Sequence, residues 1–230
     1  MIKDNYHKVL DRVQKAAKDS PFHKKVLLIA VSKMHTAEDI MEVYNEGHRD
    51  FGENKPQELA QKYEQLPGDI KWHMIGHLQT NKVKYIIDKV CMIHSVDSLK
   101  LAQVIDRESA KHGIVMPVLV EVNVGEEPQK SGVPVKDLTS LIRELSALKN
   151  IKVRGLMCIP PFGLNAEESE DYFKLLRNLS IDIKALNIDN IEMNILSMGM
   201  SDDFESAIRQ GADMVRVGTS IFGMRDYSNT

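Results

Sequence analysis

The chain has few cysteines, no large excess of charge and no long apolar run, and each absence narrows what it can be. Its two cysteines, Cys91 and Cys158, lie far apart in apolar segments, so we expect neither a disulfide framework nor a zinc site. The formal net charge is −3, from 30 basic and 33 acidic residues, which provides no electrostatic footprint for nucleic acid or anionic lipid. No apolar run approaches the ~20 residues that a membrane span needs.

The N-terminal segment also lacks the features of a signal peptide, because charged residues occur throughout it. Its apolar residues Ile2, Tyr6, Val9 and Val13 recur at helical spacing, which predicts an amphipathic helix. A chain of 230 residues with 43% hydrophobic residues can bury roughly 70% of its surface around one core. The sequence therefore predicts a cytoplasmic protein with a single domain over residues 1–230.

Eight strand-like segments alternate with helical patterns along the chain, and several are the nearly continuous apolar runs typical of buried parallel strands. The segments are Val26–Lys33, His48–Glu53, Lys71–Gly76, Val90–Asp97, Pro117–Val124, Ile151–Ile159, Glu192–Gly199 and Asp213–Gly218. Eight such units predict an α/β fold, a (β/α)₈ TIM barrel preceded by one extra N-terminal helix. The second choice is a doubly wound open sheet, but no G-x-G-x-x-G motif follows the first strand.

Lys33 is the first candidate functional residue. It follows the apolar run Leu27–Val31, so its side chain should project into the mouth of the barrel, where the active sites of such barrels lie. Loss of solvation there is expected to lower its pKa from ~10.4 toward neutrality. A neutral amine can condense with an aldehyde to form a Schiff base. The alternative is an ordinary exposed lysine just past a strand.

Two glycine-containing loops follow the seventh and eighth strands, where barrels often hold a phosphate. They supply Ser197, Gly199 and Ser201 from the first loop and Arg216, Gly218, Thr219 and Ser220 from the second. Gly199 and Gly218 let backbone N–H groups approach an anion, and the hydroxyls of Ser197, Thr219 and Ser220 add donors. The alternative is ordinary turn chemistry, with Ser201 as a helix N-cap. Arg216 could reach a phosphate or a ring nitrogen, or pair with an acidic neighbour.

Asn54 and His77 are weaker candidates. Asn54 stands at the end of the second strand, where its amide can form hydrogen bonds, although the segment also reads as a plain strand–helix junction. His77 follows the third strand, with His73 and Asn81 nearby. A metal site would need a third ligand at suitable spacing, and none is evident, so we predict no metal.

One ligand could span the lysine and the phosphate loops. Pyridoxal 5′-phosphate carries both an aldehyde and a phosphate. A sugar phosphate handled by a Schiff-base aldolase carries both groups as well, so residue spacing alone does not separate the two ligands.

Seven segments spread over nearly the whole chain carry a resemblance to a known family. They are Ala30–Lys33, Phe51–Glu58, Trp72–Lys82, Leu119–Gly132, Gly155–Pro161, Leu196–Ile208 and Val215–Gly223. In order and spacing they closely resemble the pyridoxal phosphate homeostasis protein family. The resemblance implies a pyridoxal phosphate fold type III barrel, like the N-terminal domain of alanine racemase but without its C-terminal β domain, with pyridoxal 5′-phosphate as cofactor.

The resemblance also assigns roles to individual residues. It places the Schiff-base lysine on Lys33 and the neighbour of the pyridine nitrogen on Arg216. Asn54 and His77 would line the pocket. The phosphate-binding positions fall on Ser197, Gly199, Gly218 and Thr219.

The family is credited with cofactor homeostasis and an influence on amino-acid balance, without an established turnover reaction. The alternative, a pyridoxal phosphate-dependent amino-acid racemase, needs a second acid/base group facing Lys33. In alanine racemases that group is a tyrosine of an additional domain, whereas this chain ends at Thr230, with Tyr227 in its terminal tail. We therefore expect a non-catalytic monomer that binds pyridoxal 5′-phosphate, with pyridoxal phosphate-dependent apo-enzymes as recipients.

Overall fold

A computed structural model describes residues 1–223, and within this range nine strands form one sheet. The strands are β1 (Leu27–Val31), β2 (Asp50–Glu53), β3 (Lys71–Met74), β4 (Val90–Val96), β5 (Met116–Asn123), β6 (Val133–Pro134), β7 (Ile151–Cys158), β8 (Ile191–Ser197) and β9 (Met214–Val217). Neighbouring strands pair in parallel. Tyr227, which the sequence places in the terminal tail, lies outside the described residues.

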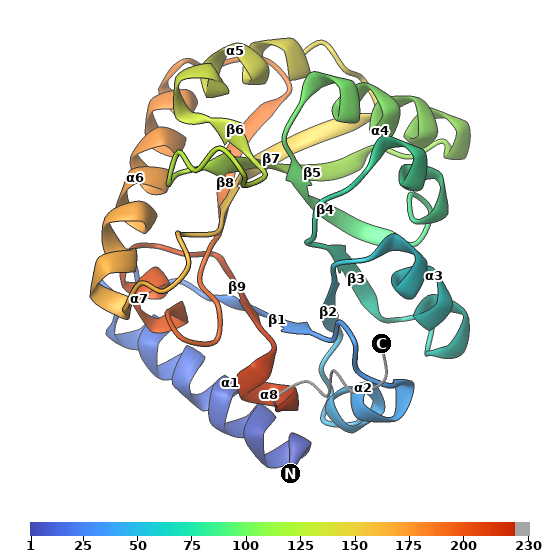
Figure 1. Ribbon diagram of the computed structural model, residues 1–230, viewed down its shortest axis with the longest axis vertical. Coiled ribbons are helices and arrows are strands. Elements are labelled where there is room, and N and C mark those ends of the chain that lie inside the picture. The colour runs from blue at the N-terminus through green and yellow to red at the C-terminus, as the bar shows by residue number, and fades with distance from the viewer. Residues whose placement is uncertain (224–230) are drawn as a thin grey trace.

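The sheet closes on itself as a barrel (Figure 1). Its strands follow the order β1–β2–β3–β4–β5–β7–β8–β9, and β9 pairs back with β1. Closure excludes the doubly wound open sheet, because an open sheet leaves two edge strands. The predicted eight-stranded barrel is therefore confirmed. The short β6, which adds to the end of β5, is not among the predicted strands.

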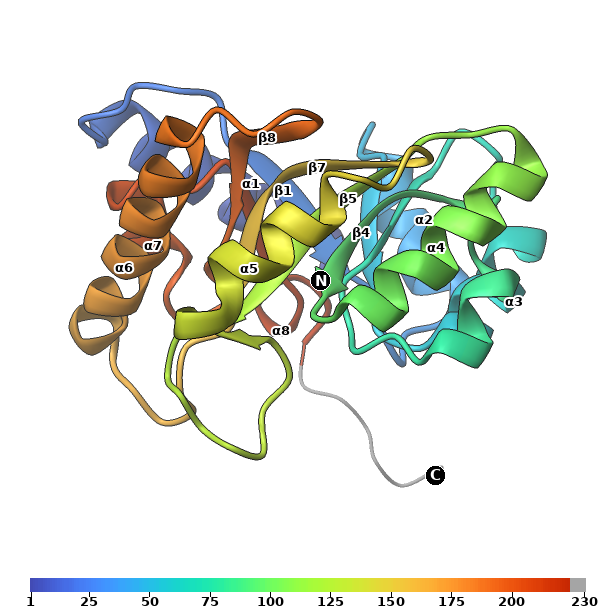
Figure 2. The same cartoon turned by 90° about the horizontal axis from the view of Figure 1, so that it is seen from above.

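Helices form a ring around the barrel (Figures 1 and 2). They are α1 (Ile2–Asp19), α2 (Ala37–Tyr44), α3 (Pro56–Gln65), the 3₁₀ helix η1 (Thr80–Tyr85), α4 (Leu99–His112), α5 (Val135–Leu145), α6 (Ala166–Ala185), α7 (Phe204–Arg209) and α8 (Thr219–Phe222). Local chemistry sets their ends. Thr36 and Asp39 form a capping box at the start of α2, and Gly113 ends α4 in the left-handed conformation, with φ +65°.

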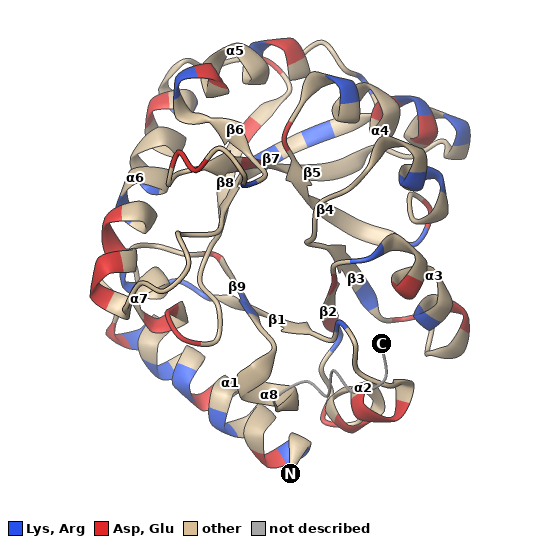
Figure 3. Cartoon of the chain, in the orientation of Figure 1, with Lys and Arg blue, Asp and Glu red and all other residues tan. Residues whose placement is uncertain are grey.

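The first helix is the predicted extra helix in front of the barrel. It buries Tyr6, Val9 and Val13 on one face and contacts α2, α7 and α8, so it completes the helical ring beside β1 (Figure 1). Lys and Arg occur together with Asp and Glu on most helices of this ring, whereas α2 carries acidic residues alone (Figure 3). Within residues 1–223, no helix combines the length and the apolar character needed to cross a membrane.

Alternate strand residues point into the barrel, and their character changes along the strands. Ile29, Met92 and Leu119 belong to an apolar cluster inside the barrel, which is separate from the core between sheet and helices. Two residues after Met92, on the same face of β4, comes the fully buried His94. The buried Arg216 likewise follows Met214 of the interior cluster by two positions. The barrel interior therefore becomes polar toward the carboxyl ends of the strands, from which the loops after β5 and β7 extend (Figure 2).

Candidate functional site

A cavity of about 320 Å³ opens at the carboxyl ends of the strands. It is lined by Val31, Lys33, Asn54, Ile75, Ile159, Phe162, Met200, Ser201, Asp202, Arg216, Gly218 and Thr219. Five of the eight predicted site residues are in this lining, although they come from segments far apart in the sequence. These five are Lys33, Asn54, Arg216, Gly218 and Thr219.

Lys33 lies in the turn after β1, two residues beyond the end of the strand at Val31. It continues the inward-facing series Leu27, Ile29 and Val31, and its side chain is half-buried. The predicted strand Val26–Lys33 is therefore too long at this end. The Ser32 N–H still bonds to Gly52 of β2, but beyond it the Ser32 carbonyl and the Met34 N–H bond to side chains, which ends the strand.

Three charged side chains hold this turn. Lys62 of α3 donates from Nζ to the carbonyl oxygen of Ser32 and to Oε1 of Glu53 and of Glu58, each at 2.7 Å. Glu53 also accepts from the Ser32 hydroxyl at 2.7 Å, and Glu58 accepts from the backbone N–H of Met34 at 2.5 Å. Both neighbours of Lys33 are thus tied to the same cluster, which we call the charged anchor.

Two of the three charged side chains in this anchor are buried. The Glu53 side chain is 0% exposed and that of Lys62 is 8% exposed. Burial raises the pKa of Glu53 and the nearby Glu58 raises it further, while the positive charge of Lys62 lowers it. The second carboxylate oxygen of Glu53 has no hydrogen-bond partner among the described residues. Loss of Lys62 would therefore leave a buried carboxylate uncompensated, which strongly destabilises a fold.

Arg216 reaches the cavity from β9 and is held by neutral oxygens. Its Nη1 donates to the Ser197 hydroxyl at 2.6 Å, and its Nη2 donates to the Cys158 carbonyl at 2.9 Å. Its side chain is buried, which lowers the pKa of the guanidinium, while Cys158, Glu121 and Asp203 oppose that shift. A guanidinium stays protonated at any physiological pH, so the barrel holds a permanent cation beside the cavity.

The loops after β8 and β9 meet at another part of the cavity wall. The backbone N–H of Ser220 donates to the Ser201 hydroxyl at 3.4 Å. Gly218 packs against β1, where an added Cβ would lie 3.2 Å from the Val31 carbonyl oxygen. Ser201 does not cap α7, which begins after Asp203, so its hydroxyl hydrogen can be donated to a ligand, as can that of Thr219. The sequence pattern suggested Ser201 only as a helix cap, and its place in the cavity lining was missed.

Ser197 and Gly199 were predicted at this wall, but neither is in the lining. Ser197 ends β8 with its side chain fully buried, and its hydroxyl bonds to Arg216 and to Nδ1 of His94, the latter at 3.0 Å. Gly199 has φ +93°, and an added Cβ would lie 2.6 Å from Cβ of Ala207 in α7. Its carbonyl accepts from the backbone N–H of Arg216 at 2.9 Å. Packing and the left-handed backbone therefore both require glycine at this position.

His77 also lies outside the cavity. Its side chain is 57% exposed and lines a separate hollow, with Nδ1 3.6 Å from an oxygen of Asp97. The backbone of the preceding residue, Gly76, packs closely against Asn54: an added Cβ at Gly76 would lie 2.5 Å from the Asn54 carbonyl oxygen. This close approach packs the chain against Asn54 at the cavity before His77 turns away. In the part of the chain that the structure describes, no three His, Cys, Asp or Glu side chains are grouped to hold a metal.

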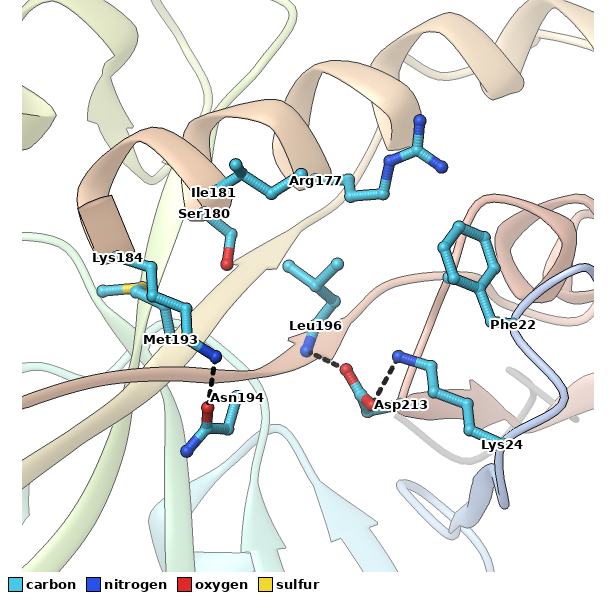
Figure 4. Close-up of a pocket in the computed structure, with 11 residues that line it drawn as sticks. Phe22, Lys24, Arg177, Ser180, Ile181, Lys184, Met193, Asn194, Leu196 and Asp213 are labelled. Carbon is cyan, nitrogen blue, oxygen red and sulfur yellow. Dashed lines mark hydrogen bonds and ion pairs between the residues drawn. The ribbon is translucent and has the colours of Figure 1, made fainter.

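A second hollow of about 310 Å³ lies outside the barrel, between α6 and the segments that lead into β1 and β9 (Figure 4). Its polar groups pair mainly with one another. Lys24 and Asp213 form an ion pair at 2.6 Å, and Lys184 donates to Asn194 at 3.1 Å. Asp213 also accepts from the backbone N–H of Leu196 at 2.8 Å. These groups are engaged in supporting the sheet, so we place the functional site at the carboxyl end.

Relatives cover the chain almost completely. Residues 4–226 match the family model described as alanine racemase, N-terminal domain. The pyridoxal phosphate homeostasis protein of Aquifex aeolicus is 46% identical over 222 residues, which cover 96% of each chain. The protein of the same name from Pseudomonas aeruginosa is 39% identical over 228 residues, which cover 98% of this chain and 96% of that one.

Solved structures show the same architecture. PipY of Synechococcus elongatus, solved with PLP bound, matches with a TM-score of 0.86 and 35% identity over 97% of this chain and 100% of that one. Alanine racemase of Corynebacterium glutamicum shares the fold, with a TM-score of 0.74 and 15% identity over 62% of its own length. The chain therefore belongs to the alanine racemase N-terminal domain family, and within it to the pyridoxal phosphate homeostasis proteins.

Proposed function

We propose that this chain binds pyridoxal 5′-phosphate in the cavity at the carboxyl end of its barrel and takes part in intracellular homeostasis of that cofactor. The observation that carries the proposal is that Lys33, Arg216 and Thr219 line one cavity although they lie at the ends of different strands. The names of relatives up to 46% identical and the PLP-bound structure of PipY support it.

The chemistry of the lining fits this ligand. Lys33 provides a primary amine, Arg216 provides N–H donors, and Thr219 and Ser201 provide hydroxyls for a phosphate. When bound, the cofactor supplies an aldehyde carbon to which an amine can add. The volume of about 320 Å³ falls within the ~300–1,000 Å³ of small-molecule sites.

The apolar part of the lining suits a planar aromatic ring. Ile75 and Ile159 contribute branched aliphatic side chains from the ends of β3 and β7. Such surfaces bury a ring by the hydrophobic effect, while the surrounding polar groups fix its orientation. Lys33, Arg216 and the Gly218–Thr219 segment would then contact the aldehyde, the ring nitrogen and the phosphate, in that order.

The charged anchor gives Lys33 a defined position before the ligand arrives. Because Ser32 and Met34 are both hydrogen-bonded to it, the amine starts from a fixed turn. A preorganised group loses less conformational freedom on binding, which strengthens capture of the ligand. This arrangement suits a protein whose task is to hold a reactive aldehyde.

We infer a role in binding and transfer rather than turnover. A racemase needs two proton-exchanging groups on opposite sides of the substrate carbon. Within the described lining, Lys33 is joined by one other side chain that readily exchanges protons, the exposed Asp202. An aldehyde carrier needs only the amine and the phosphate contacts. Measured racemisation of D- or L-alanine at enzyme-like rates, lost in Lys33→Ala, would contradict this inference.

As a carrier, the chain would act as a cytoplasmic monomer and pass the cofactor to pyridoxal phosphate-dependent apo-enzymes. When the loaded protein is mixed with such an apo-enzyme, the activity of the enzyme should return faster than pyridoxal 5′-phosphate is released from the loaded protein into buffer. If enzyme activity returns at the same rate whether or not the two proteins can touch, the cofactor is not transferred directly.

The experiment that tests the proposed function is covalent trapping. The purified protein is incubated with pyridoxal 5′-phosphate, reduced with borohydride, digested and analysed by mass spectrometry. We expect a pyridoxyl adduct on the peptide that carries Lys33 and none in Lys33→Ala, while the exposed Lys100→Ala behaves like the wild type. Trapping of a sugar phosphate instead would favour the aldolase alternative, and an adduct on another lysine would refute the assignment.

A further inference from the structure

A series of hydrogen-bonded side chains runs from Arg216 across the barrel interior to Asp50. All of them are buried except Asp50, which is partly exposed. Arg216 bonds to Ser197 at 2.6 Å, and Ser197 bonds to Nδ1 of His94 at 3.0 Å. Nε2 of His94 lies 3.0 Å from Nδ1 of His73, and Nε2 of His73 lies 3.1 Å from Oδ1 of Asp50. The chain connects the carboxyl end of β8 with the first residue of β2, and we call it the imidazole chain.

The two end members fix the direction of each bond. An arginine can only donate, and an ionised aspartate can only accept. With both rings neutral, His73 donates from Nε2 to Asp50 and accepts at Nδ1, so His94 donates from Nε2 and accepts at Nδ1. Ser197 completes this series of hydrogen bonds by donating its hydroxyl hydrogen to His94 and accepting from Arg216. Each hydrogen bond is satisfied with both imidazoles neutral.

The electrostatic surroundings agree with these assignments. Burial raises the pKa of Asp50, but the hydrogen bond from His73 and the charge of Lys71 bring it below its usual value, so the carboxylate is ionised. Burial, with His73 and Arg216 nearby, lowers the pKa of His94 well below its usual value. His73 and His94 are 2% and 0% exposed, so water cannot replace a missing partner at either ring.

We propose that His94 is a positioning residue for the ligand site, acting through Ser197 on Arg216. Because the hydroxyl hydrogen of Ser197 is committed to His94, the serine oxygen presents a lone pair to Arg216. The guanidinium is thereby fixed on two neutral oxygens, those of Ser197 and Cys158, and its other N–H groups remain for the cavity that Arg216 lines. This inference rests on the proposed function only in naming pyridoxal 5′-phosphate as the ligand that Arg216 meets.

His94 contacts no part of the cavity itself, which makes its role separable from ligand contact. Without the acceptor at Nδ1, the hydroxyl of Ser197 loses its fixed rotamer and can turn its hydrogen toward Arg216. Two donors would then face each other in a buried site, which costs free energy and displaces the guanidinium. The effect should therefore reach the ligand entirely through Ser197.

The first test uses the wild-type protein without added ligand and reads the histidine tautomers from long-range nitrogen–proton NMR correlations. We expect His94 to be neutral with its hydrogen on Nε2, and His73 likewise. The exposed His112 serves as the reference, since it should exchange between forms. A hydrogen on Nδ1 of His94, or a charged His94 ring, would reverse the bond to Ser197 and overturn the proposal.

The second test measures the Kd of pyridoxal 5′-phosphate and the absorption spectrum of the complex for three variants. His94→Leu and Ser197→Ala should each weaken binding about tenfold, since each disturbs one hydrogen bond to a charged group. The double variant should bind no more weakly than Ser197→Ala, because the two residues act in series. His94→Asn, which keeps an acceptor near the Nδ1 position, should recover most of the affinity and the spectrum, and His112→Asn should match the wild type.

Additive losses in the double variant, or a His94→Asn variant as weak as His94→Leu, would overturn the proposal, because either result indicates a general packing role. Failure of the proposed function looks different: the wild-type protein itself would then not bind pyridoxal 5′-phosphate. The tautomer measurement decides the bond directions in both cases, and it does so even if His94→Leu does not fold.

Discussion

Lys33 and Arg216 line the same cavity but are supported in opposite ways. The Lys33 turn is tied to the charged anchor, in which the buried Lys62 pairs with the buried Glu53 and the partly exposed Glu58. Arg216 is held by a serine hydroxyl and a carbonyl oxygen. Three side chains separate it from Asp50, the carboxylate at the other end of the imidazole chain. The difference shows that the barrel fixes the Lys33 turn with ion pairs, and that it holds Arg216 with neutral oxygens, which leave its charge for a ligand.

The two supports fit two different requirements. The amine of Lys33 must lose its charge to react with an aldehyde. The ion pairs that hold its turn are made by Lys62 with Glu53 and Glu58. Arg216 must keep donors for a ligand, so its bonds go to neutral oxygens that do not neutralise it. The comparison predicts that the charged anchor governs stability, whereas the imidazole chain governs affinity.

The largest expected effect is on the charged anchor. Lys62→Met leaves the buried carboxylate of Glu53 uncompensated and should lower the free energy of unfolding by about 3–5 kcal/mol in urea titrations. The matched control is the double variant Glu53→Gln/Lys62→Met, which removes both charges and should recover part of the loss. If the double variant is no more stable than Lys62→Met, the cost does not come from the unpaired charge.

A second expectation concerns the loop that supports Arg216. Gly199→Ala combines a left-handed backbone with a clash against Ala207, and should cost about 2–4 kcal/mol of unfolding free energy. Gly163 provides a control, because its φ is +85° but nothing lies within 4 Å of an added Cβ. Gly163→Ala should cost only about 1 kcal/mol, the penalty of a left-handed backbone for a residue with a Cβ. Equal costs in thermal or urea unfolding would mean that close packing at Gly199 is unimportant.

A third and smaller effect should appear as a pH dependence near Arg216. Burial raises the pKa of Glu121 to about 7 from 4.5, with Asp97 adding to the shift and Arg216 opposing it. Between these values the folded protein binds more protons than the unfolded chain, so the free energy of unfolding falls as pH rises through this window. Glu121→Gln should therefore stabilise the protein by about 2–3 kcal/mol at pH 8 and hardly at pH 4.

The measurement for Glu121 is urea unfolding at several pH values. Glu144, an exposed glutamate on α5, offers the control Glu144→Gln, for which we expect no pH-dependent gain. A stabilisation by Glu121→Gln that is the same at pH 4 and pH 8 would show that packing, and not ionisation, distinguishes the variant from the wild type.

Sequence patterns were enough to predict the barrel and half of the site. Apolar runs located the eight strands of the barrel, and the alternation from Leu27 to Val31 correctly directs Lys33 inward. Residues at strand ends are easy to predict because parallel strands end at one face of a barrel. Asn54, Gly218 and Thr219 lie in the cavity lining for this reason.

The rest depended on three-dimensional relations that spacing does not contain. Ser197 and Ser201 flank the same glycine-containing run, and only the structure shows that the first faces inward while the second lines the cavity. Lys62 lies 29 positions after Lys33, on a helix, and supports it by bonding to the Ser32 carbonyl. The sequence pattern predicts a strand at Ser32 and Lys33, where the structure has a turn. The contact of His73 with His94 depends on the register of β3 against β4.

The central claim is that one cavity receives the aldehyde at Lys33, the ring nitrogen at Arg216 and the phosphate at Gly218 and Thr219. The most direct measurement is a crystal structure of the protein grown with pyridoxal 5′-phosphate. We expect electron density continuous with Nζ of Lys33, with the phosphate against the Gly218–Thr219 backbone and the Ser201 hydroxyl. Ligand density in the outer hollow beside Lys24, or a phosphate remote from Thr219, would contradict the account.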